Sequence, residues 1–207
     1  MEEIIAAFTE AFKNPNWLEV AGIITALAYV FLASRENILC WPFAAISTTI
    51  YMYLVFDVGL YLETILQFFY LIMAFVGWYQ WVYGKKNQQE LHISRLTQKQ
   101  WFVTISAGIL LTFSAGFSFD YFLNNEDAYL DAFTTVFAFI ATWMVVRKIL
   151  ENWLFWIVID AVSIILYFNR GLYFSTFLYL LYTIIAIYGF WLWKKKYESR
   201  NKFVKLS

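Results

Sequence analysis

Charged residues are scarce in this chain. They make up 14% of its 207 residues, while hydrophobic residues make up 62% and aromatic residues 23%. An average soluble domain carries about 25% charged residues, and its helices keep a polar stripe along one side. The stretches 43–56 and 177–193 have no such stripe. These absences exclude a water-soluble domain and indicate a protein whose main solvent is lipid.

Cysteine and histidine are also rare. Cys40 is the only cysteine, so no intramolecular disulfide can form, and the only histidine, His92, falls in an expected loop. No histidine metal cluster or histidine-based catalytic pair can therefore be assembled. The chain has no GxxxxGK[ST] phosphate-binding loop, and Lys194 follows the last apolar run, inside which a retinal protein would need a lysine. We expect no enzyme activity, no metal and no cofactor.

Seven long apolar runs occupy most of the chain. Each approaches the roughly 20 residues that a helix needs to cross a bilayer. The runs are continuous, whereas a transmembrane barrel shows alternating polarity in segments of about 10 residues. The predicted spans are 17–34, 38–56, 60–83, 101–119, 130–146, 153–168 and 173–193.

The loops between these runs alternate in charge. Basic residues follow the first, third, fifth and seventh runs, whereas acidic residues such as Asp57 and Asp120 occupy the other loops. The positive-inside rule then places the N-terminus outside and the C-terminus in the cytoplasm. Arg170 is the one exception to this pattern. The basic tail is better explained as a topology signal than as a nucleic-acid site.

An internal repeat relates residues 40–81 to residues 152–193 at a constant offset of 112 residues, without a gap. The identical pairs include Trp41 and Trp153, Phe56 and Phe168, Gly59 and Gly171, Thr64 and Thr176, Tyr70 and Tyr182, Gly77 and Gly189, and Trp81 and Trp193. The offset corresponds to a shift of four helices, which preserves orientation across the bilayer. Parallel repeats of this kind occur in transporters, with the substrate near the midplane at the repeat interface. A duplicated bundle with no transport role is the alternative.

The predicted fold is therefore an all-α membrane protein with two parallel three-helix repeats joined by one linking helix. The expected segments are an amphipathic surface segment (1–16), a first triple-helix bundle (17–83), a cytoplasmic loop and linking helix (84–120), a second bundle (121–193) and a basic cytoplasmic tail (194–207). Gly59 and Gly171 fall near the outer turns, and Gly77 and Gly189 near the inner ends. These glycines serve either an alternating-access motion or close packing between helices.

Polar side chains deep inside the spans mark candidate functional positions, because an unsatisfied polar group facing lipid is costly. Gln67 lies in the third span and Asp160 in the middle of the sixth, and their repeat-mates are Tyr179 and Thr48. One carboxylate, one amide and several aromatic rings suit a flat cationic ligand. The substrate-binding candidates are Gln67, Asp160, Trp41, Tyr70, Trp78, Trp153, Trp156, Ser163 and Tyr182. Helix–helix hydrogen bonds and aromatic packing are the structural alternatives.

The segments GLYLETILQFFYLIMAFVGWYQW and RKILENWLFWIVIDAVSIILYFNRGLY resemble the PnuC family of bacterial vitamin transporters. The resemblance runs from about residue 17 to residue 193. It implies a fold of three plus one plus three helices, similar to SWEET sugar transporters, and a homotrimer in the bacterial cytoplasmic membrane. It also implies facilitated diffusion of a vitamin into the cytoplasm, where a kinase traps the substrate by phosphorylation.

Members of this family carry nicotinamide riboside, with thiamin and riboflavin branches. In the nicotinamide riboside branch a third-helix glutamine, a sixth-helix asparagine and surrounding tryptophans hold the substrate. Gln67 matches the glutamine, whereas Asp160 stands where the asparagine is expected. Nicotinamide riboside and thiamin both carry a positive ring that a carboxylate attracts. We expect nicotinamide riboside, with thiamin as the nearest alternative; a proton-coupled carrier and a non-transporting scaffold are further alternatives.

Overall fold

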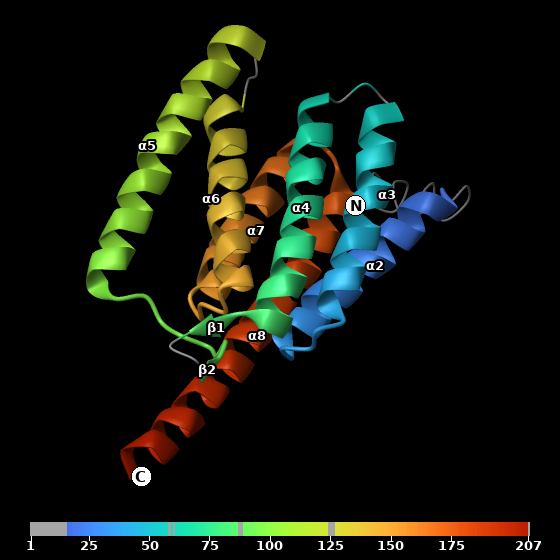
Figure 1. Ribbon diagram of the computed structural model, residues 1–207. Helices are drawn as coiled ribbons and strands as arrows, with labels where there is room; N and C mark the ends of the chain where they lie inside the picture. Colours follow the sequence, from blue (N-terminus) through green and yellow to red (C-terminus); the bar gives the residue numbers. More distant parts are fainter. Residues whose placement is uncertain (1–15, 58, 60, 87–88, 124–126, 207) are drawn as a thin grey trace. The chain divides into compact units, whose positions relative to one another are not determined.

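The computed structural model describes residues 16–57, 59, 61–86, 89–123 and 127–206. In chain order the elements are α2 (Trp17–Ser34), α3 (Cys40–Asp57), α4 (Tyr61–Tyr83), β1 (Lys85–Lys86), β2 (Gln89–Glu90), α5 (Gln98–Leu123), α6 (Ala128–Val146), α7 (Asn152–Asn169) and α8 (Tyr173–Leu206) (Figure 1). The two short strands pair antiparallel. Residues 1–15 of the predicted amphipathic segment lie outside the described residues.

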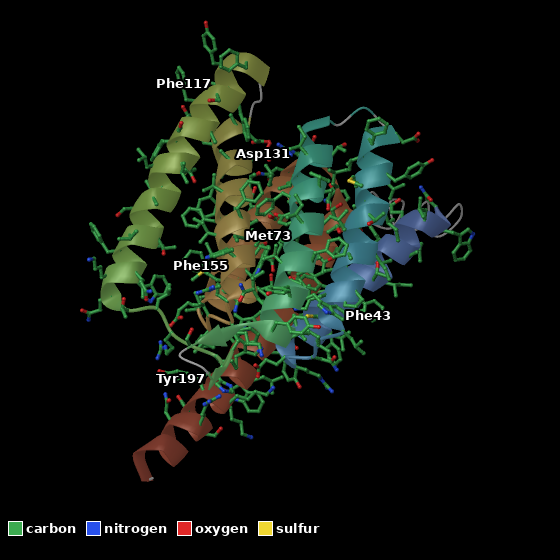
Figure 2. All side chains as sticks on the ribbon, viewed as in Figure 1. Phe43, Met73, Phe117, Asp131, Phe155 and Tyr197 are labelled. Carbon is green, nitrogen blue, oxygen red and sulfur yellow. The ribbon has the colours of Figure 1, made fainter. Side chains whose placement is uncertain are left out.

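The chain forms two compact units, Met1–His92 and Ile93–Ser207. In the first unit α3 contacts both α2 and α4, and in the second unit α7 contacts α6 and α8 while α5 contacts α6. Each unit thus contains three consecutive packed helices, and the linking helix α5 belongs to the second unit. Phe155 of α7 is labelled in Figure 2. Its ring stacks with Trp101 of α5 at a centroid distance of 5.6 Å and contacts Phe137 of α6 at 5.9 Å.

Six of the described helices, all except α3, are long and apolar enough to cross a membrane. α3 has a suitable length, but its hydroxyl residues and terminal Asp57 make it less apolar. Those hydroxyls are satisfied inside the protein, since Thr48 donates to the carbonyl of Ala44 at 2.9 Å and Ser47 to that of Gly22 at 3.3 Å. A helix whose polar groups are bonded internally is compatible with lipid, so α3 completes a set of seven.

The helix ends agree with the predicted spans within a few residues, except at α8. α2 coincides with the predicted first span, and α5 begins three residues earlier and ends four residues later than the predicted linking helix. α8 continues to Leu206, through the basic segment that the sequence predicts as a tail from residue 194. Residues 194–206 contain no glycine or proline and several lysines, which are good helix formers. The basic tail is therefore the end of a single long helix.

The α2–α3 and α6–α7 turns have the same backbone conformation. Each holds a non-glycine residue in the left-handed region, Glu36 with φ 58° and Lys148 with φ 50°. In both turns the next amide N–H donates to the carbonyl five residues earlier, at 2.9 Å in the first turn and 2.8 Å in the second. This pattern is typical of a Schellman motif at a helix C-terminus. The two left-handed residues are 112 positions apart, so the backbone conformation of the turns repeats with the same offset as the sequence.

The α3–α4 and α7–α8 turns repeat in the same way, this time with glycine. Gly59 has φ 78° and Gly171 has φ 71°, a region that residues with a Cβ rarely adopt. Nothing lies within 4 Å of a Cβ built at either position. Backbone conformation, and not close packing, therefore explains these two glycines.

Arg170, the exception to the predicted charge pattern, is paired with two acidic residues of the α6 N-terminus. Its Nη2 lies 2.9 Å from Asp127 Oδ2 and 3.0 Å from Asp131 Oδ2. The three side chains carry a net negative charge together. The ion pairs also join the start of α6 to the α7–α8 turn.

Candidate functional site

The interior of the second unit contains a carboxylate in the middle of a helix. Asp160 of α7 is 3% exposed, as is Ser163 one turn later. No described residue donates a hydrogen bond to the Asp160 carboxylate. Burying a charge without a partner costs free energy, and ionisable residues inside spans commonly face a substrate pathway. The position therefore fits a group whose environment is completed by a ligand.

Three tyrosines of α7 and α8 form a connected cluster that reaches Asp160. The rings of Tyr167 and Tyr179 stack at a centroid distance of 5.1 Å and an angle of 15°, and Tyr182 meets Tyr179 edge-on at 5.9 Å. The Tyr179 hydroxyl is hydrogen-bonded with Tyr167 and interacts electrostatically with Asp160. The cluster thus brings aromatic faces and hydroxyl groups beside the buried carboxylate.

The candidates predicted from sequence include Tyr182 but omit Tyr167 and Tyr179. Two signals could have identified them. Tyr179 is the repeat-mate of Gln67, and Tyr167 lies seven residues after Asp160, on the same helical face. Of the other predicted residues on α7, Trp156 is half-buried one turn before Asp160, and Ser163 is buried one turn after it.

In the first unit, α4 carries an amide and a phenol on one face. Gln67 and Tyr70 are three residues apart and both are half-buried. These residues give the first unit its own set of polar aromatic groups at a similar place in the repeat, because Tyr70 is the repeat-mate of Tyr182.

An apolar groove of about 370 Å³ lies between α3 and α4. Its lining residues are Trp41, Pro42, Ala45, Ala74, Phe75 and Trp78. The groove brings together two predicted binding residues, Trp41 and Trp78. It can accommodate an apolar ring, but its lining contains no charged residue.

Trp41 and Trp153 hold equivalent, almost fully buried positions in the two repeats. Each is 2% exposed and meets a second tryptophan edge-on at 88°, in the pairs Trp41 with Trp81 (5.3 Å) and Trp153 with Trp193 (5.5 Å). Each also covers a glycine of the facing helix, Gly77 or Gly189, where an added Cβ would overlap the indole ring. Their indole N–H groups have no acceptor among the described residues. This geometry favours the packing alternative for both tryptophans and for both glycines.

Among the described residues, no group of three histidine, cysteine, aspartate or glutamate side chains could hold a metal ion. The second unit brings Asp160 and Ser163 together with the tyrosine cluster. The first unit brings Trp41 and Trp78 together and places Gln67 beside Tyr70 on α4. The arrangement can bind a ligand through charge, hydrogen bonds and aromatic faces.

A duplicated three-helix bundle of membrane-spanning length, with an ionisable residue buried inside one span, is typical of helical membrane carriers. Residues 16–195 match the family described as nicotinamide mononucleotide transporter. This match covers most of the chain, which therefore belongs to that transporter family.

Individual relatives agree with the family match. The chain is 27% identical to the nicotinamide riboside transporter PnuC of Escherichia coli (strain K12), covering 90% of this chain and 88% of that protein. It is 25% identical to the riboflavin/roseoflavin transporter RibM of Streptomyces davaonensis, covering 94% and 93%. The crystal structure of the vitamin B3 transporter PnuC matches with a TM-score of 0.72 and 25% identity, over 94% of this chain and 88% of that chain. The predicted PnuC-type fold is confirmed.

Proposed function

We propose that this protein carries a small cationic vitamin across the bacterial cytoplasmic membrane and that nicotinamide riboside is its substrate. The family match and the nicotinamide riboside transporters among its relatives support this function. The observation in the chain itself that carries the proposal is the buried Asp160 carboxylate beside the tyrosine cluster.

The chemistry of these groups suits a pyridinium riboside. A carboxylate attracts the positive ring and accepts hydrogen bonds from ribose hydroxyls, while each aromatic face adds roughly 0.5–2 kcal/mol of cation–π attraction. We assign substrate contacts to Asp160, Ser163, Trp156, Tyr179 and Tyr182 in the second unit. Gln67, Tyr70 and Trp78 are the candidate binding residues of the first unit. Trp41 and Trp153 support these helices by packing inside each unit.

Transport follows the substrate gradient in this proposal. The chain has no phosphate-binding loop, so a cytoplasmic kinase makes uptake productive by phosphorylating the arriving substrate. The N-terminus is outside and the C-terminus in the cytoplasm, in agreement with the charge pattern of the loops. The functional unit is a homotrimer.

Thiamin is the second candidate substrate, because an aspartate in place of the expected asparagine suits its thiazolium ring equally well. The RibM relative makes riboflavin a further candidate. This vitamin carries no positive charge, so a buried carboxylate offers it hydrogen-bond acceptors but no charge attraction. The three ligands are therefore distinguished by direct binding.

The test is a titration of the purified protein with nicotinamide riboside, thiamin and riboflavin, by calorimetry and by intrinsic tryptophan fluorescence. The variants are Asp160→Asn and Gln67→Ala, with Asp57→Asn as a control because Asp57 is an exposed carboxylate at the end of α3. We expect saturable binding of nicotinamide riboside that Asp160→Asn weakens about tenfold or more, the effect of losing one charged contact. The control should bind like the parent.

Tight thiamin binding with weak nicotinamide riboside binding would show that thiamin is the substrate, and the proposed carrier function would stand. If Asp160→Asn binds as tightly as the parent, the charge of Asp160 does not contribute to substrate binding. If none of the three ligands binds to folded protein, the vitamin-transport proposal fails.

A further inference from the structure

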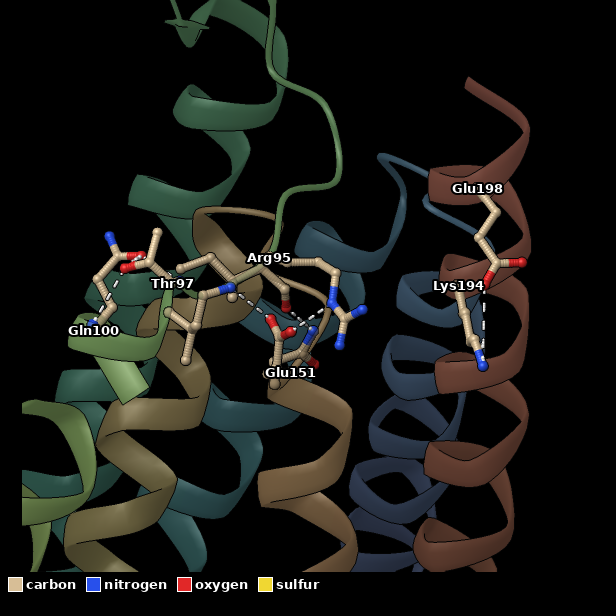
Figure 3. Close-up of polar contacts among 9 residues, drawn as sticks. Arg95, Thr97, Gln100, Glu151, Lys194 and Glu198 are labelled. Atoms are coloured by element: carbon tan, nitrogen blue, oxygen red, sulfur yellow. Dashed lines mark hydrogen bonds and ion pairs between the residues drawn. The ribbon is translucent and has the colours of Figure 1, made fainter. Parts of the chain in front are cut away.

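Glu151 is a second buried carboxylate, outside the candidate site. It lies directly before the first residue of α7 and is 1% exposed. Both of its oxygens accept hydrogen bonds: Oε1 from Arg95 Nε at 2.9 Å, and Oε2 from the backbone N–H of Leu96 at 3.0 Å (Figure 3). Hydrogen bonds to an ionised group are the strong ones. The bond to Glu151 also raises the pKa of Arg95, which further favours the charged form of this side chain.

Backbone hydrogen bonds hold the same segment. The N–H of Ser94 donates to the carbonyl of Lys148, and the carbonyl of Ser94 accepts from the N–H of Leu150, both at 2.9 Å. Four hydrogen bonds therefore join residues 94–96 to residues 148–151, which belong to the α6–α7 turn. We call this set of contacts the Glu151 clamp.

The linking helix starts immediately after the Glu151 clamp. Thr97 and Gln100 form a capping box, in which the Thr97 N–H donates to Gln100 Oε1 at 2.9 Å and the Gln100 N–H donates to Thr97 Oγ1 at 3.3 Å. Trp101, in the first turn of α5, stacks on Phe155 of α7. No flexible residues separate the clamp from the helix, so the start of α5 is fixed to the α6–α7 turn.

Comparison of the two repeats shows that the turn itself does not need this carboxylate. The repeat-mate of Glu151 is Leu39, which is 51% exposed, although the backbone of the two turns is the same. The buried charge is thus an addition to the second repeat, where its partners come from the segment that leads into α5.

We infer that Glu151 is a positioning residue that makes the linking helix a fixed part of the second unit. The boundary between the two units falls after His92, just before Ser94. The start of α5 then keeps its place against the α6–α7 turn throughout the transport cycle. This inference rests on the proposed transport function, because it concerns how α5 is held while the substrate is carried.

The experiment uses the full-length protein in lipid nanodiscs and in proteoliposomes. The variants are Glu151→Gln, Arg95→Gln and the double variant, with Thr97→Ala as a matched control that weakens the start of α5 without touching the clamp. Hydrogen exchange is measured at the amides of Ser94, Leu96 and Leu150. Initial rates of nicotinamide riboside uptake give the maximal rate and KM, and calorimetry gives binding affinity.

We expect Glu151→Gln to accelerate amide exchange at Ser94 and Leu96 about tenfold or more, the effect of one lost charged hydrogen bond. The maximal uptake rate should fall severalfold, while KM and binding affinity stay within about twofold of the parent. The double variant should be no worse than Glu151→Gln, because the two side chains act as one contact. Thr97→Ala should leave exchange at Ser94 and Leu150 unchanged.

Unchanged exchange in Glu151→Gln would overturn the clamp. Faster exchange with a normal maximal uptake rate would overturn the positioning role and leave the proposed function standing. Absence of uptake by the parent protein would instead overturn the proposed function, and with it the role in transport. If Glu151→Gln does not fold, Arg95→Gln provides the same test of the Arg95–Glu151 contact. The Arg95 side chain is 52% exposed, so its replacement leaves the core unchanged.

Discussion

Thr48 and Asp160 are repeat-mates with different local chemistry. The Thr48 hydroxyl donates to the carbonyl of Ala44 within its own helix, whereas the Asp160 carboxylate accepts no hydrogen bond from the described residues. We expect Thr48→Ala to change nicotinamide riboside affinity by less than about twofold, because its polar atom is already satisfied. Calorimetry beside Asp160→Asn checks this. A loss of affinity as large as that of Asp160→Asn would show that α3 also contacts the substrate.

Replacement by alanine should destabilise the turn glycines (Gly59 and Gly171) and the glycines packed against tryptophan (Gly77 and Gly189) for different reasons. At Gly171 an added Cβ meets nothing within 4 Å, so Gly171→Ala should cost only the left-handed backbone conformation, about 1–2 kcal/mol. Thermal unfolding in one detergent measures the loss. Gly171→Asn should be less destabilising, since asparagine tolerates this region. Equal destabilisation by both would argue against a conformational cause.

Gly189→Ala should act through Trp153 instead. Its Cβ would come within 2.8 Å of the indole ring, and overpacking of this kind costs about 1–3 kcal/mol. The double variant Gly189→Ala/Trp153→Phe should recover part of that loss, because the smaller ring leaves room for the methyl group. A double variant that is less stable than the sum of its single changes would contradict this account.

At the level of secondary-structure elements, the apolar runs of the sequence predict the helices but not the conformation of the turns between them. The sequence predicts all seven helices and the equivalence of Trp41 and Trp153, because runs and repeats are local properties of the chain. The left-handed residues Glu36 and Lys148 could not be predicted, since neither residue type favours that region. The helical conformation of the basic tail was also not predicted, because the expected boundary at residue 194 followed the loss of hydrophobicity and not a helix-breaking residue.

The α6–α7 turn allows a direct test of its backbone. Lys148 has φ 50°, so Lys148→Gly should relieve strain and Lys148→Val should increase it, because a β-branched residue is a clear outlier there. We expect the glycine variant to be more stable than the valine variant by about 1–2 kcal/mol. Thermal midpoints measured side by side in one detergent provide the comparison, and equal midpoints would show that the turn can adopt another conformation.

Across the whole molecule, the distribution of charge predicts which ends of the helices face the cytoplasm. Cys40 is the only cysteine and is buried, so Cys40→Ser gives a cysteine-free parent. In that background we expect Lys202→Cys to react with a membrane-impermeant maleimide only after the cells are opened, and Asp57→Cys to react in intact cells. The opposite labelling pattern would invert the proposed topology.

The candidate site was only partly predictable from the sequence, because part of it depends on contacts between residues that are distant in the chain. Asp160 and Gln67 stand out in sequence because polar residues are rare inside apolar runs. The burial of Trp41 and Trp153 against glycines depends on contacts between helices. The stacking of Tyr179 on Tyr167 depends on them in the same way. The Glu151 clamp joins residues more than fifty positions apart, so no local pattern indicates it.

The continuity of α8 has a mechanical consequence. A helix of 34 residues is about 51 Å long at 1.5 Å per residue, which is well beyond the roughly 30 Å of a hydrocarbon core. A tilt of about 10° around its first turn would carry the far end through roughly 9 Å. Because of this length, a spin label at position 202 would convert even a slight tilt of the span into a displacement large enough to follow during a transport cycle.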